Sequence, residues 1–358
     1  MANTSNKEAL RELRSKIDLW AMDEGFSKAG VTDLELDQAT NHLRHWLSKN
    51  YQADMNWIKD RLDLRENPSQ LVPGALRAIC FRMDYLQDKA QPLEILNNPN
   101  KAYISRYALG RDYHKVIRKK LARIAVKIQD WADKELQQRP FVDSAPILEK
   151  PLGHKAGLGW IGKNTLLLSQ EGGSWFFLGE ILTSLELPID MEKEENQCGK
   201  CKACITCCPT DAFPEPYILD ANRCISYLTI ENAGAIPLEL REPMGNRVFG
   251  CDDCQLVCPW NRDASLSTNA NFSPRHQLED SDLIEIFQWN RSEFEEKTAG
   301  SPIRRAGFDQ WQRNLAVGLG NGEKSSEAIH ALQNCDNPSA IVREHIEWAI
   351  NKLGNDPV

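Results

Sequence analysis

The amino-acid sequence predicts an α+β protein in three parts: a mixed helix–strand half, a cysteine-rich insert and a helical C-terminal segment. Nine of the 11 cysteines lie between residues 198 and 258, with long cysteine-poor stretches on either side. Helical and strand patterns alternate upstream of this block, whereas only helical patterns follow it. We therefore expect domains over residues 1–190, 191–265 and 266–358.

The first part is expected to combine long helices with buried strands. Residues 7–24 and 111–136 have the apolar spacing of helices, the latter through positions at steps of three and four: Ile117, Leu121, Ile124, Ile128 and Trp131. Short apolar runs are typical of buried strands. They are "LRAICFRM" (76–83), "TLLLS" (165–169) and "WFFLGEIL" (175–182).

The last part is expected to be entirely helical from residue 282 to residue 353. Trp311, Leu315 and Leu319 recur on one helix face, and Asn337–Pro338 is expected to begin a final helix. That helix carries the apolar residues Val342, Ile346, Ala349 and Leu353. Short helix pairs of this kind favour HEAT-like units. The charged segment "MEKEENQ" (191–197) is the expected linker into the cysteine-rich insert.

Three uses of the cysteines compete: disulfides, zinc and iron–sulfur clusters. A chain of 358 residues can build its own cores and has no need of the disulfides that small secreted domains use. The polar N-terminus lacks the apolar run of a signal peptide, and no run of about 18 apolar residues could span a membrane. We expect a cytoplasmic protein with reduced thiols and no membrane partner.

The spacing of the thiols indicates iron–sulfur clusters. Cys198, Cys201, Cys204 and Cys208 follow C-x2-C-x2-C-x3-C-P, which is typical of bacterial two-cluster ferredoxins. A zinc ribbon also uses paired C-x2-C units, but it needs only four ligands and does not end its runs with Cys-Pro. The insert is therefore expected to be ferredoxin-like.

A second set of thiols repeats the motif with its first member far upstream: Cys224, Cys251, Cys254 and Cys258. In the crossed arrangement of these ferredoxins, the last cysteine of each run binds the other cluster. One [4Fe–4S] cluster is then assigned to Cys198, Cys201, Cys204 and Cys258, and the other to Cys208, Cys224, Cys251 and Cys254. Cys207 is out of frame and is expected not to be a ligand, and Cys80 and Cys335 stand alone.

The charge of the chain is unevenly distributed. The net charge is −8, yet residues 101–134 hold ten Lys or Arg against three Asp, a local charge of +7. A solvated helix face is one explanation of this stretch, and a surface that contacts phosphates is the other. The candidate phosphate contacts are Lys115, Arg118, Lys119, Lys120 and Arg123.

A glycine-rich stretch, residues 142–169, allows close backbone approach to a large ligand. It does not match a Walker loop. "GLGWIG" (157–162) fits G-x-G-x-x-G, but it lacks a preceding strand and the acidic residue about 20 positions later that a Rossmann site needs. Asp143, at the start of this stretch, could simply cap a turn before Ser-Ala-Pro.

Five motifs in order resemble epoxyqueuosine reductases over about residues 30–350. They are "YALGRDYHKV" (107–116), "VDSAP" (142–146) with "KAGLGWIGKNT" (155–165), the "CGKCKAC…CP" run, "RCISYLTIE" (223–231) and "GNRVFGCDDCQLVCPWN" (245–261). Cys207 is the one departure noticed. The resemblance implies a cobalamin-dependent enzyme, similar to reductive dehalogenases, whose residues 1–190 form a corrinoid-binding catalytic domain. Its two [4Fe–4S] clusters would supply electrons from a donor such as a flavodoxin or ferredoxin.

The implied reaction is the last step of queuosine synthesis: reduction of epoxyqueuosine to queuosine at the wobble position of tRNA. Asp143 matches the catalytic acid, and it could donate a proton near neutral pH if its apolar neighbours Val142, Ala145 and Pro146 raised its pKa. The resemblance also implies contacts with the corrinoid, as cob(II)alamin, by Arg65, Tyr107, Asp143, Asn164, Ser169, Ser226 and Asp252.

His114 is not expected to bind cobalt, because no D-x-H-x-x-G run surrounds it. Two alternatives to this function remain at the level of sequence. One is a ferredoxin-type electron carrier, and the other is a related reductase of a small organohalide or free nucleoside. The basic stretch disfavours the second alternative, since a small neutral substrate needs no such surface.

Overall fold

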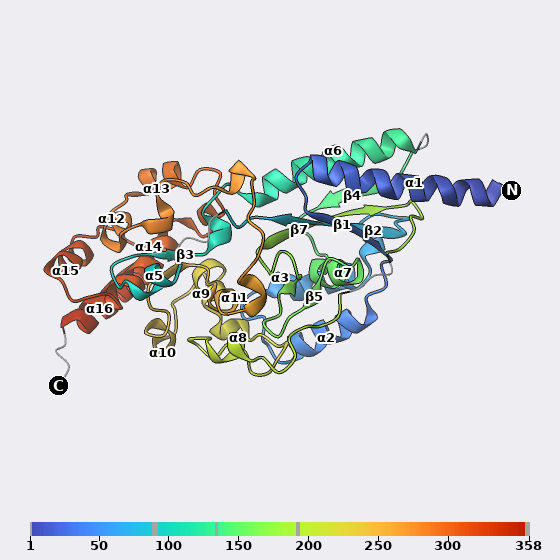
Figure 1. Cartoon of the computed structure of the whole chain (residues 1–358). Helices are drawn as coiled ribbons and strands as arrows, with labels where there is room; N and C mark the ends of the chain where they lie inside the picture. The colour runs from blue at the N-terminus through green and yellow to red at the C-terminus, as the bar shows by residue number, and fades with distance from the viewer. Residues whose placement is uncertain (1, 88–91, 133–134, 191–193, 355–358) are drawn as a thin grey trace.

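The computed structural model describes residues 2–87, 92–132, 135–190 and 194–354, with side chains described from residue 7 onward. The molecule is elongated, with the N-terminal helix at one end and the C-terminal helices at the other (Figure 1). A four-stranded sheet lies between them and carries the N-terminal half. None of the helices in these ranges is long and apolar enough to cross a lipid bilayer.

The sheet is antiparallel throughout, with the strand order β1-β2-β7-β4. Its strands are β1 (Lys28–Thr32), β2 (Arg77–Asp84), β4 (Gln138–Phe141) and β7 (Phe176–Thr183). The two central strands are buried on both faces, which explains why their sequences are nearly continuous apolar runs. Glu180 of β7, paired in register with Cys80 of β2, is an exception to this composition.

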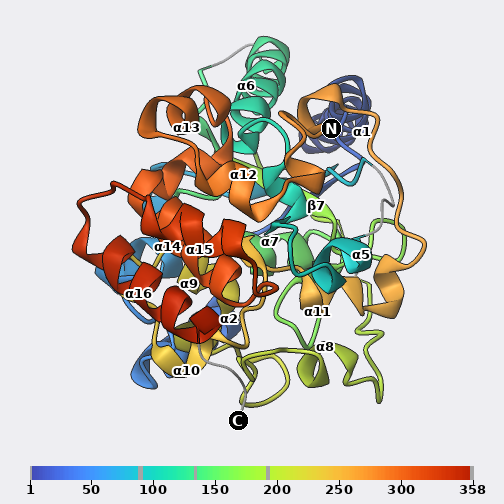
Figure 2. The same cartoon turned by 90° about the vertical axis from the view of Figure 1, so that its left-hand side faces the viewer.

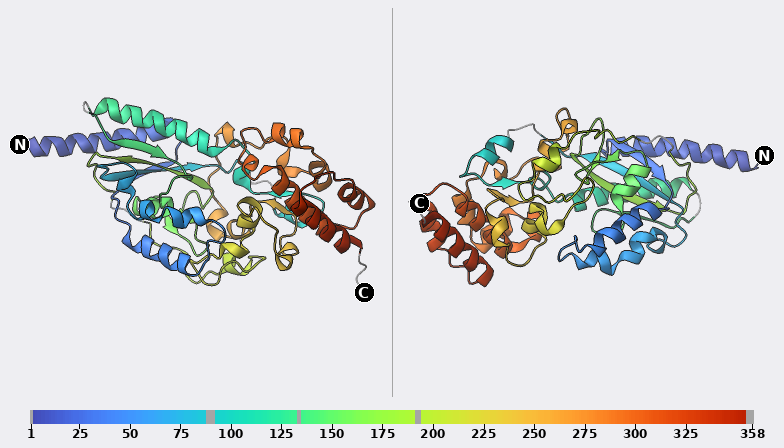
Figure 3. Two further views of the ribbon diagram at one scale, coloured as in Figure 1. Left: turned by 180° about the vertical axis from the view of Figure 1, so that it is seen from behind. Right: turned by 90° about the horizontal axis from the view of Figure 1, so that it is seen from below.

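Helices cover both faces of the sheet, as Figure 1 and the view from behind in Figure 3 show. On one face pack α1 (Ala2–Asp23) and α6 (Tyr113–Trp131), whose apolar side chains form one core with the strands. On the other face lie α2 (Asp37–Ser48), α3 (Asn56–Asp60), α4 (Leu62–Glu66) and α7 (Glu149–Lys155). The N-terminal half is therefore a three-layer α/β/α unit.

The cysteine-rich insert is built from short elements. These are α8 (Ala203–Thr206), α9 (Ile225–Ile230), α10 (Leu238–Arg241), α11 (Asp253–Leu256) and β8 (Arg247–Phe249). Strand β8 pairs in parallel with β3 (Tyr103–Ile104), so a segment of the N-terminal half crosses into this region. A second small sheet joins β5 (Trp160–Ile161) to β6 (Leu167–Leu168).

The C-terminal segment, which faces the viewer in Figure 2, packs as helices around their own core. The helices are α12 (Leu283–Phe287), α13 (Arg291–Lys297), α14 (Gly307–Gly320), α15 (Ser326–Gln333) and α16 (Ala340–Gly354). Ala102, Ile104, Ala108 and Leu109 also belong to this core, so the chain enters it before the proposed boundary at residue 266. The remaining short helices are α5 (Pro92–Asn97) and the 3-10 turns Pro68–Gln70, Arg106–Ala108, Ala221–Arg223, Pro259–Asn261, Ala270–Phe272, Leu278–Asp280 and Pro302–Arg305.

Two buried polar residues of α14 fasten the helical segment to the insert. The guanidinium of Arg313 donates to the carbonyls of Leu228 and Asn232 at 2.7 Å each. The amide of Asn314 donates to the carbonyls of Thr229 and Val248 at 2.8 and 2.9 Å. Such fully paired buried groups fix one docking geometry, because any other leaves them unsatisfied.

The predicted α+β class is confirmed, and so are the strands expected over residues 76–83 and 175–182, whereas only Leu167–Leu168 of "TLLLS" forms a strand. The helix predicted over 111–136 ends at Trp131, and the linker prediction falls partly on residues 191–193, outside the described residues. Strands β1 and β4 were missed, because "KAGVT" and "QRPF" lack a clear strand pattern. They become strands through pairing with β2 and β7.

Candidate active site and iron–sulfur centres

Asp143 lies in the loop between β4 and α7, in a left-handed backbone conformation with φ +49°. Such a conformation costs a residue other than glycine about 1–3 kcal/mol, and aspartate is among the residues that tolerate it best. Its side chain is 51% exposed, so it faces the surface of the N-terminal half. Its Oδ2 atom accepts hydrogen bonds from the Tyr113 hydroxyl at 2.5 Å and lies 2.8 Å from His114 Nε2.

His114 is held by groups on both sides of its ring. Asp112 caps the N-terminus of α6 and lies 2.8 Å from His114 Nδ1 through its Oδ1 atom. On the other side, Nε2 meets both Asp143 and the guanidinium of Arg305, the latter at 3.1 Å. The ring is buried and stacks on Tyr113, which itself stacks on Phe177. Both ring nitrogens are therefore engaged by protein groups.

The protonation of this pair differs from the expectation for Asp143. Burial acts to raise the pKa of Asp143, but hydrogen bonds from His114 and Tyr113 outweigh it and lower the pKa below its usual value. Burial likewise acts to lower the pKa of His114, and its bonds with Asp112 and Asp143 raise it instead. The proton therefore belongs to His114, and the expected raised pKa of Asp143 is wrong.

The guanidinium of Arg305 disfavours a positive charge on His114. A guanidinium N–H can donate to a ring nitrogen only when that nitrogen carries a lone pair. The 3.1 Å contact with His114 Nε2 therefore favours neutral His114, and the positive charge of Arg305 lowers the pKa of both His114 and Asp143. The proton of the pair lies along the 2.8 Å contact between Nε2 and Oδ2. Sequence patterns missed Tyr113 and Arg305; the Asp-Tyr-His order at residues 112–114 was the available signal.

Two of the residues proposed to contact the corrinoid have polar groups available. Tyr107 is half-buried, with its ring against Tyr113 and Phe249, and the charges of Asp143, Glu231 and Arg305 lie near its hydroxyl. Ser226, in α9, is also half-buried. Among the described residues, neither hydroxyl has a hydrogen-bond partner.

Besides Asp143, the other four proposed corrinoid contacts are engaged inside the protein. Arg65 donates to the carbonyls of its own helical region, and Asn164 donates to the Cys254 carbonyl at 3.3 Å. Ser169 is fully buried and accepts from Arg82 at 2.7 Å. Asp252 is buried and accepts from the Tyr103 and Ser105 hydroxyls and the Arg106 amide. These four side chains are therefore held by hydrogen bonds within the protein.

The cysteines of the insert form two groups of neighbours. Burial, followed by the thiols of Cys258, Cys198 and Cys201, raises the pKa of Cys204 to about 11. The thiol of Cys224 neighbours Cys208, and it lies close to both Cys251 and Cys254. Helices α8 and α11 contact each other and bring the two runs together. The folded chain thus places Cys258 beside the first run, although Cys258 lies 50 positions after Cys208, the last cysteine of that run.

The donor set fits iron–sulfur clusters. Thiols that raise one another's pKa are stabilised as thiolates when a cationic centre binds and deprotonates them. No three His, Cys, Asp or Glu side chains in the described ranges converge on a single-ion site. A cubane needs no such convergence, because each thiolate binds its own iron. Cys207 instead directs its thiol to the Cys204 carbonyl at 3.5 Å.

The proposed phosphate contacts on α6 divide into two sets. Lys120 donates to the Glu24 carbonyl, and Arg123 forms an ion pair with the Glu24 carboxylate, so both tie α6 to the end of α1. Lys115, Arg118 and Lys119 are exposed and have no partner within the described part of the chain. The second set alone is available to a ligand.

Arg118 also lines a hollow of about 520 Å³ beside the Asp143 loop. Arg61 and Arg139 line it too, together with Ser144, Ala145 and Pro146 of the loop itself. No acidic side chain is among the described residues that line it. Three guanidinium groups therefore surround a space next to the candidate acid, a feature that the sequence pattern did not reveal.

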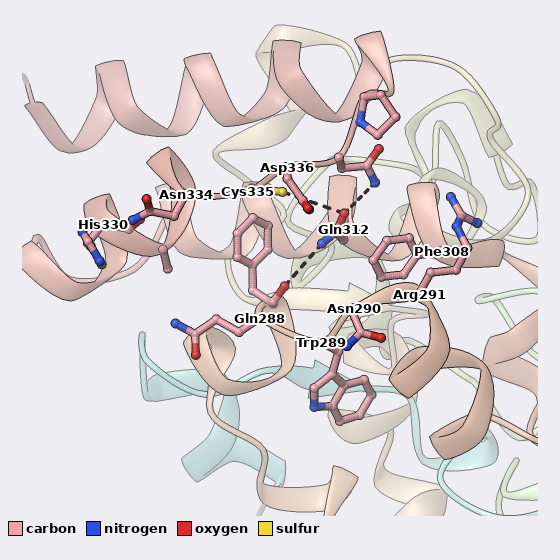
Figure 4. Close-up of a pocket in the computed structure, with 14 residues that line it drawn as sticks. Gln288, Trp289, Asn290, Arg291, Phe308, Gln312, His330, Asn334, Cys335 and Asp336 are labelled. Carbon is pink, nitrogen blue, oxygen red and sulfur yellow. Dashed lines mark hydrogen bonds between the residues drawn. The ribbon is translucent and has the colours of Figure 1, made fainter.

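Another hollow, of about 480 Å³, lies in the C-terminal segment (Figure 4). Trp289, Phe308 and Gln312 line it, and Gln312 accepts a 2.6 Å hydrogen bond from Asn337. Neither Asp143 nor a thiol of the two cysteine groups borders it. The residues that line this hollow are therefore not part of the candidate active site or of the cysteine groups.

Comparisons with known proteins agree with this arrangement. The family described as "Epoxyqueuosine reductase QueG, DUF1730" matches residues 65–144, and "4Fe-4S double cluster binding domain" matches residues 197–261. The chain is 51% identical to the epoxyqueuosine reductase of Pseudomonas aeruginosa, over 96% of this chain and 95% of the relative. It is also 51% identical to the Escherichia coli epoxyqueuosine reductase, over 95% of this chain and 89% of the relative.

Solved structures give the same result. A crystal structure of an epoxyqueuosine reductase matches with a TM-score of 0.88 and 27% identity, covering 97% of this chain and 92% of that one. A second, bound to an epoxyqueuosine-modified tRNA-Tyr stem loop, matches with a TM-score of 0.86 and 27% identity, over 97% and 91% of the two chains. A Bacillus subtilis structure, 26% identical with a TM-score of 0.86 over the same shares, has its catalytic loop swung out of the active site.

The fold and the two thiol groups define an iron–sulfur oxidoreductase with two [4Fe–4S] clusters. The similarity over nearly the whole length identifies the family within that class. The chain belongs to the epoxyqueuosine reductase family.

Proposed function

We infer that this protein reduces epoxyqueuosine to queuosine at the wobble position of tRNA. The observation that carries the inference is the related structure, similar along 97% of this chain, that holds an epoxyqueuosine-modified stem loop. The reaction consumes two electrons and two protons: both C–O bonds of the epoxide break, a C=C bond forms and the oxygen leaves as water. The protein must therefore deliver electrons singly, supply protons and hold an RNA.

For electron delivery, we propose the crossed ligand sets. Cys198, Cys201, Cys204 and Cys258 would bind one cluster, and Cys208, Cys224, Cys251 and Cys254 the other. The neighbour relations of Cys204 and Cys224 support this assignment. Each cluster carries one electron at a time, which suits a one-electron donor such as a flavodoxin or ferredoxin. We place the reaction in the cytoplasm, with its tRNA substrate.

We also propose a bound cobalamin as the resident cofactor at the site. Tyr107 and Ser226 would hold its polar groups, since their hydroxyls are available, while Arg65, Asn164, Ser169 and Asp252 maintain the surrounding walls. When bound, the cofactor would supply a strongly reducing metal centre for the epoxide carbon. The protein's own part is to orient the nucleoside and protonate the leaving oxygen.

For the proton, we propose the His114–Asp143 pair, which holds one proton across a 2.8 Å contact. The half-exposed Asp143 loses water when an RNA covers the site, and desolvation favours the neutral pair over the ion pair. Arg305 disfavours the positive charge on His114, whose pKa it lowers. Asp143 then carries the proton and can pass it to the epoxide oxygen.

A dependence on pH follows from the raised pKa of His114. The pair keeps its proton up to a pH above the ordinary histidine value of about 6.5 and loses it as the pH rises further. Single-turnover conversion should therefore be level below that pKa and fall on its alkaline side. Because glutamine cannot hold the proton, the alkaline fall of the pH–rate profile should lie at a different pH in His114→Gln. Identical pH–rate profiles for the two proteins would contradict a shared proton.

For the RNA, we propose that Lys115, Arg118 and Lys119 contact backbone phosphates together with Arg61 and Arg139 of the adjoining hollow. The hollow borders the Asp143 loop, so a phosphate there would bring a neighbouring nucleotide to the acid. The absence of acidic residues from its described lining suits an anionic ligand. Lys120 and Arg123 are proposed only as supports, because both are bound to Glu24.

Charge reversal on α6 provides a test of this surface. Arg118→Glu with Lys119→Glu should weaken binding of the modified stem loop and reduce the slope of log K against log salt by about one for each lost phosphate contact. Lys49→Glu, at the residue that follows helix α2 on the other face of the sheet, reverses one exposed charge and should leave the slope unchanged. If all three proteins share one slope, α6 is a solvated face.

The function as a whole is tested by composition and by conversion. Anaerobically purified protein should contain cobalt as well as iron and sulfide, and should convert epoxyqueuosine to queuosine in a tRNA stem loop when chemically reduced. Iron without cobalt, and no conversion, would favour an electron carrier. Conversion of a small organohalide but not of the stem loop would favour the small-molecule reductase.

A further inference from the structure

Glu180 is a carboxyl group buried in the middle of the sheet. It belongs to the central strand β7, and its side chain has no exposed surface. Within the described residues, no N–H or hydroxyl group donates to either of its carboxylate oxygens. An ionised carboxylate in that position would be desolvated without compensation, which proteins avoid. The geometry therefore requires a neutral Glu180 or a partner of another kind.

Glu149 is that partner. It is the first residue of α7, the helix that packs on β7, and its carboxyl group lies close enough to that of Glu180 for each to affect the pKa of the other. Two carboxyl groups can form a hydrogen bond only if a proton lies between them. Burial, followed by the Coulomb effect of Asp143, raises the pKa of Glu149 to about 7, and burial followed by the charge of Glu149 raises the pKa of Glu180 well above its usual value.

The same Glu149 carboxyl also holds the loop of the candidate acid. Its Oε1 atom accepts the backbone N–H of Asp143. That amide belongs to the residue in the left-handed conformation, whose backbone needs an external contact to remain there. While His114 and Tyr113 bind the Asp143 side chain, Glu149 binds its main chain. A chain of contacts thus runs from the buried strand to the surface loop.

We propose that Glu149 and Glu180 are positioning residues that share one proton and together latch the Asp143 loop against the site. Glu180 carries the proton and donates a hydrogen bond to Glu149. Glu149 therefore remains an acceptor and can also accept the hydrogen bond from the Asp143 amide. The inference rests on the proposed role of Asp143, because a latch matters for turnover only if the loop carries the acid. In the Bacillus subtilis relative, a structure with this catalytic loop swung out shows that such a loop has a second position.

Hydrogen exchange tests the latch without reference to activity. In Glu149→Ala, the amides of residues 142–148 should exchange at least tenfold faster than in the wild-type holoenzyme, because the Asp143 amide loses its acceptor. Glu180→Leu, similar in volume but without a donor, should accelerate exchange as well. Glu180→Gln should keep the slow exchange of the wild type, since the glutamine amide can donate to Glu149 as the acid does. Glu186→Gln, an exposed carboxyl just beyond β7, serves as the matched control.

The shared proton has its own spectroscopic signature. At pH 8 the wild-type infrared spectrum should contain the carbonyl band of a protonated carboxylic acid, and Glu180→Gln should remove it while Glu186→Gln leaves it. Turnover should fall about tenfold in Glu149→Ala with the KM for the stem loop within twofold. Absence of the band in the wild type, or unchanged exchange in Glu149→Ala, would overturn the proposal. If Glu180→Leu fails to fold, the infrared band of the wild type and the exchange rates of Glu149→Ala still test the proposal.

The outcomes also separate the latch from the function. Faster exchange in Glu149→Ala, combined with normal turnover in Asp143→Asn, would retain the latch and reject Asp143 as the acid. Unchanged exchange in Glu149→Ala, combined with an inactive Asp143→Asn, would reject the latch and retain the acid.

Discussion

Replacing Asp143 by Asn should lower single-turnover conversion of epoxyqueuosine by roughly two to four orders of magnitude, the usual contribution of a general acid. Asparagine has the same shape, tolerates the left-handed backbone of residue 143, and can accept the Tyr113 hydrogen bond through its carbonyl oxygen. It cannot carry the proton that His114 shares across the 2.8 Å contact. Iron content, cobalt content and stem-loop affinity should therefore stay near wild type.

The measurement is the conversion of a modified stem loop by chemically reduced enzyme in a single turnover, so that the electron donor does not limit the rate. Tyr113→Phe is the matched control, because it removes one hydrogen bond to the same Asp143 oxygen and leaves the acid in place. Its rate should fall less than tenfold. Conversion by Asp143→Asn within threefold of wild type would show that another group or a water supplies the proton.

Replacing Cys258 by Ala should remove one whole cluster. The intact, anaerobically reconstituted protein is expected to hold about eight irons, as two [4Fe–4S] clusters require. Cys258 lies 50 positions after Cys208, yet its thiol neighbours Cys198 and Cys201 in the fold. Its loss should therefore damage the cluster of the first run, lower iron to about four per chain and abolish turnover.

Cys207→Ala is the control for Cys258→Ala, since it deletes a thiol from the same crowded region. Its thiol points to the Cys204 carbonyl, so iron and sulfide should stay nearly unchanged. The checks are iron and sulfide analysis with electron paramagnetic resonance of the reduced proteins. Equal iron in Cys258→Ala and wild type, or about four irons in the intact protein, would contradict the crossed assignment.

The sequence by itself determined the parts of this protein whose information is local. Cysteine spacing indicated two clusters, because short gaps dictate which thiolates can surround a cubane. Apolar periodicity located α6 and the central strands β2 and β7, because burial selects apolar residues at the helical or strand repeat. The motifs around residues 107–165 and 223–261 placed the chain in its family, which the comparisons confirmed.

The tertiary structure decided the features that join distant residues. Arg305 is 191 positions from His114, and only the packing of the helical segment against the N-terminal half brings its guanidinium to Nε2. Hydrogen bonds from His114 and Tyr113 of α6 lower the pKa of Asp143, whose apolar neighbours in sequence had indicated the opposite. Likewise, the charge count on α6 gave no sign that Lys120 and Arg123 are bound to Glu24. Glu180, within an apolar strand, meets Glu149 only because α7 folds back on the sheet. Charge, pKa and hydrogen bonding depend on neighbours in space, and for these residues those neighbours are far away along the chain.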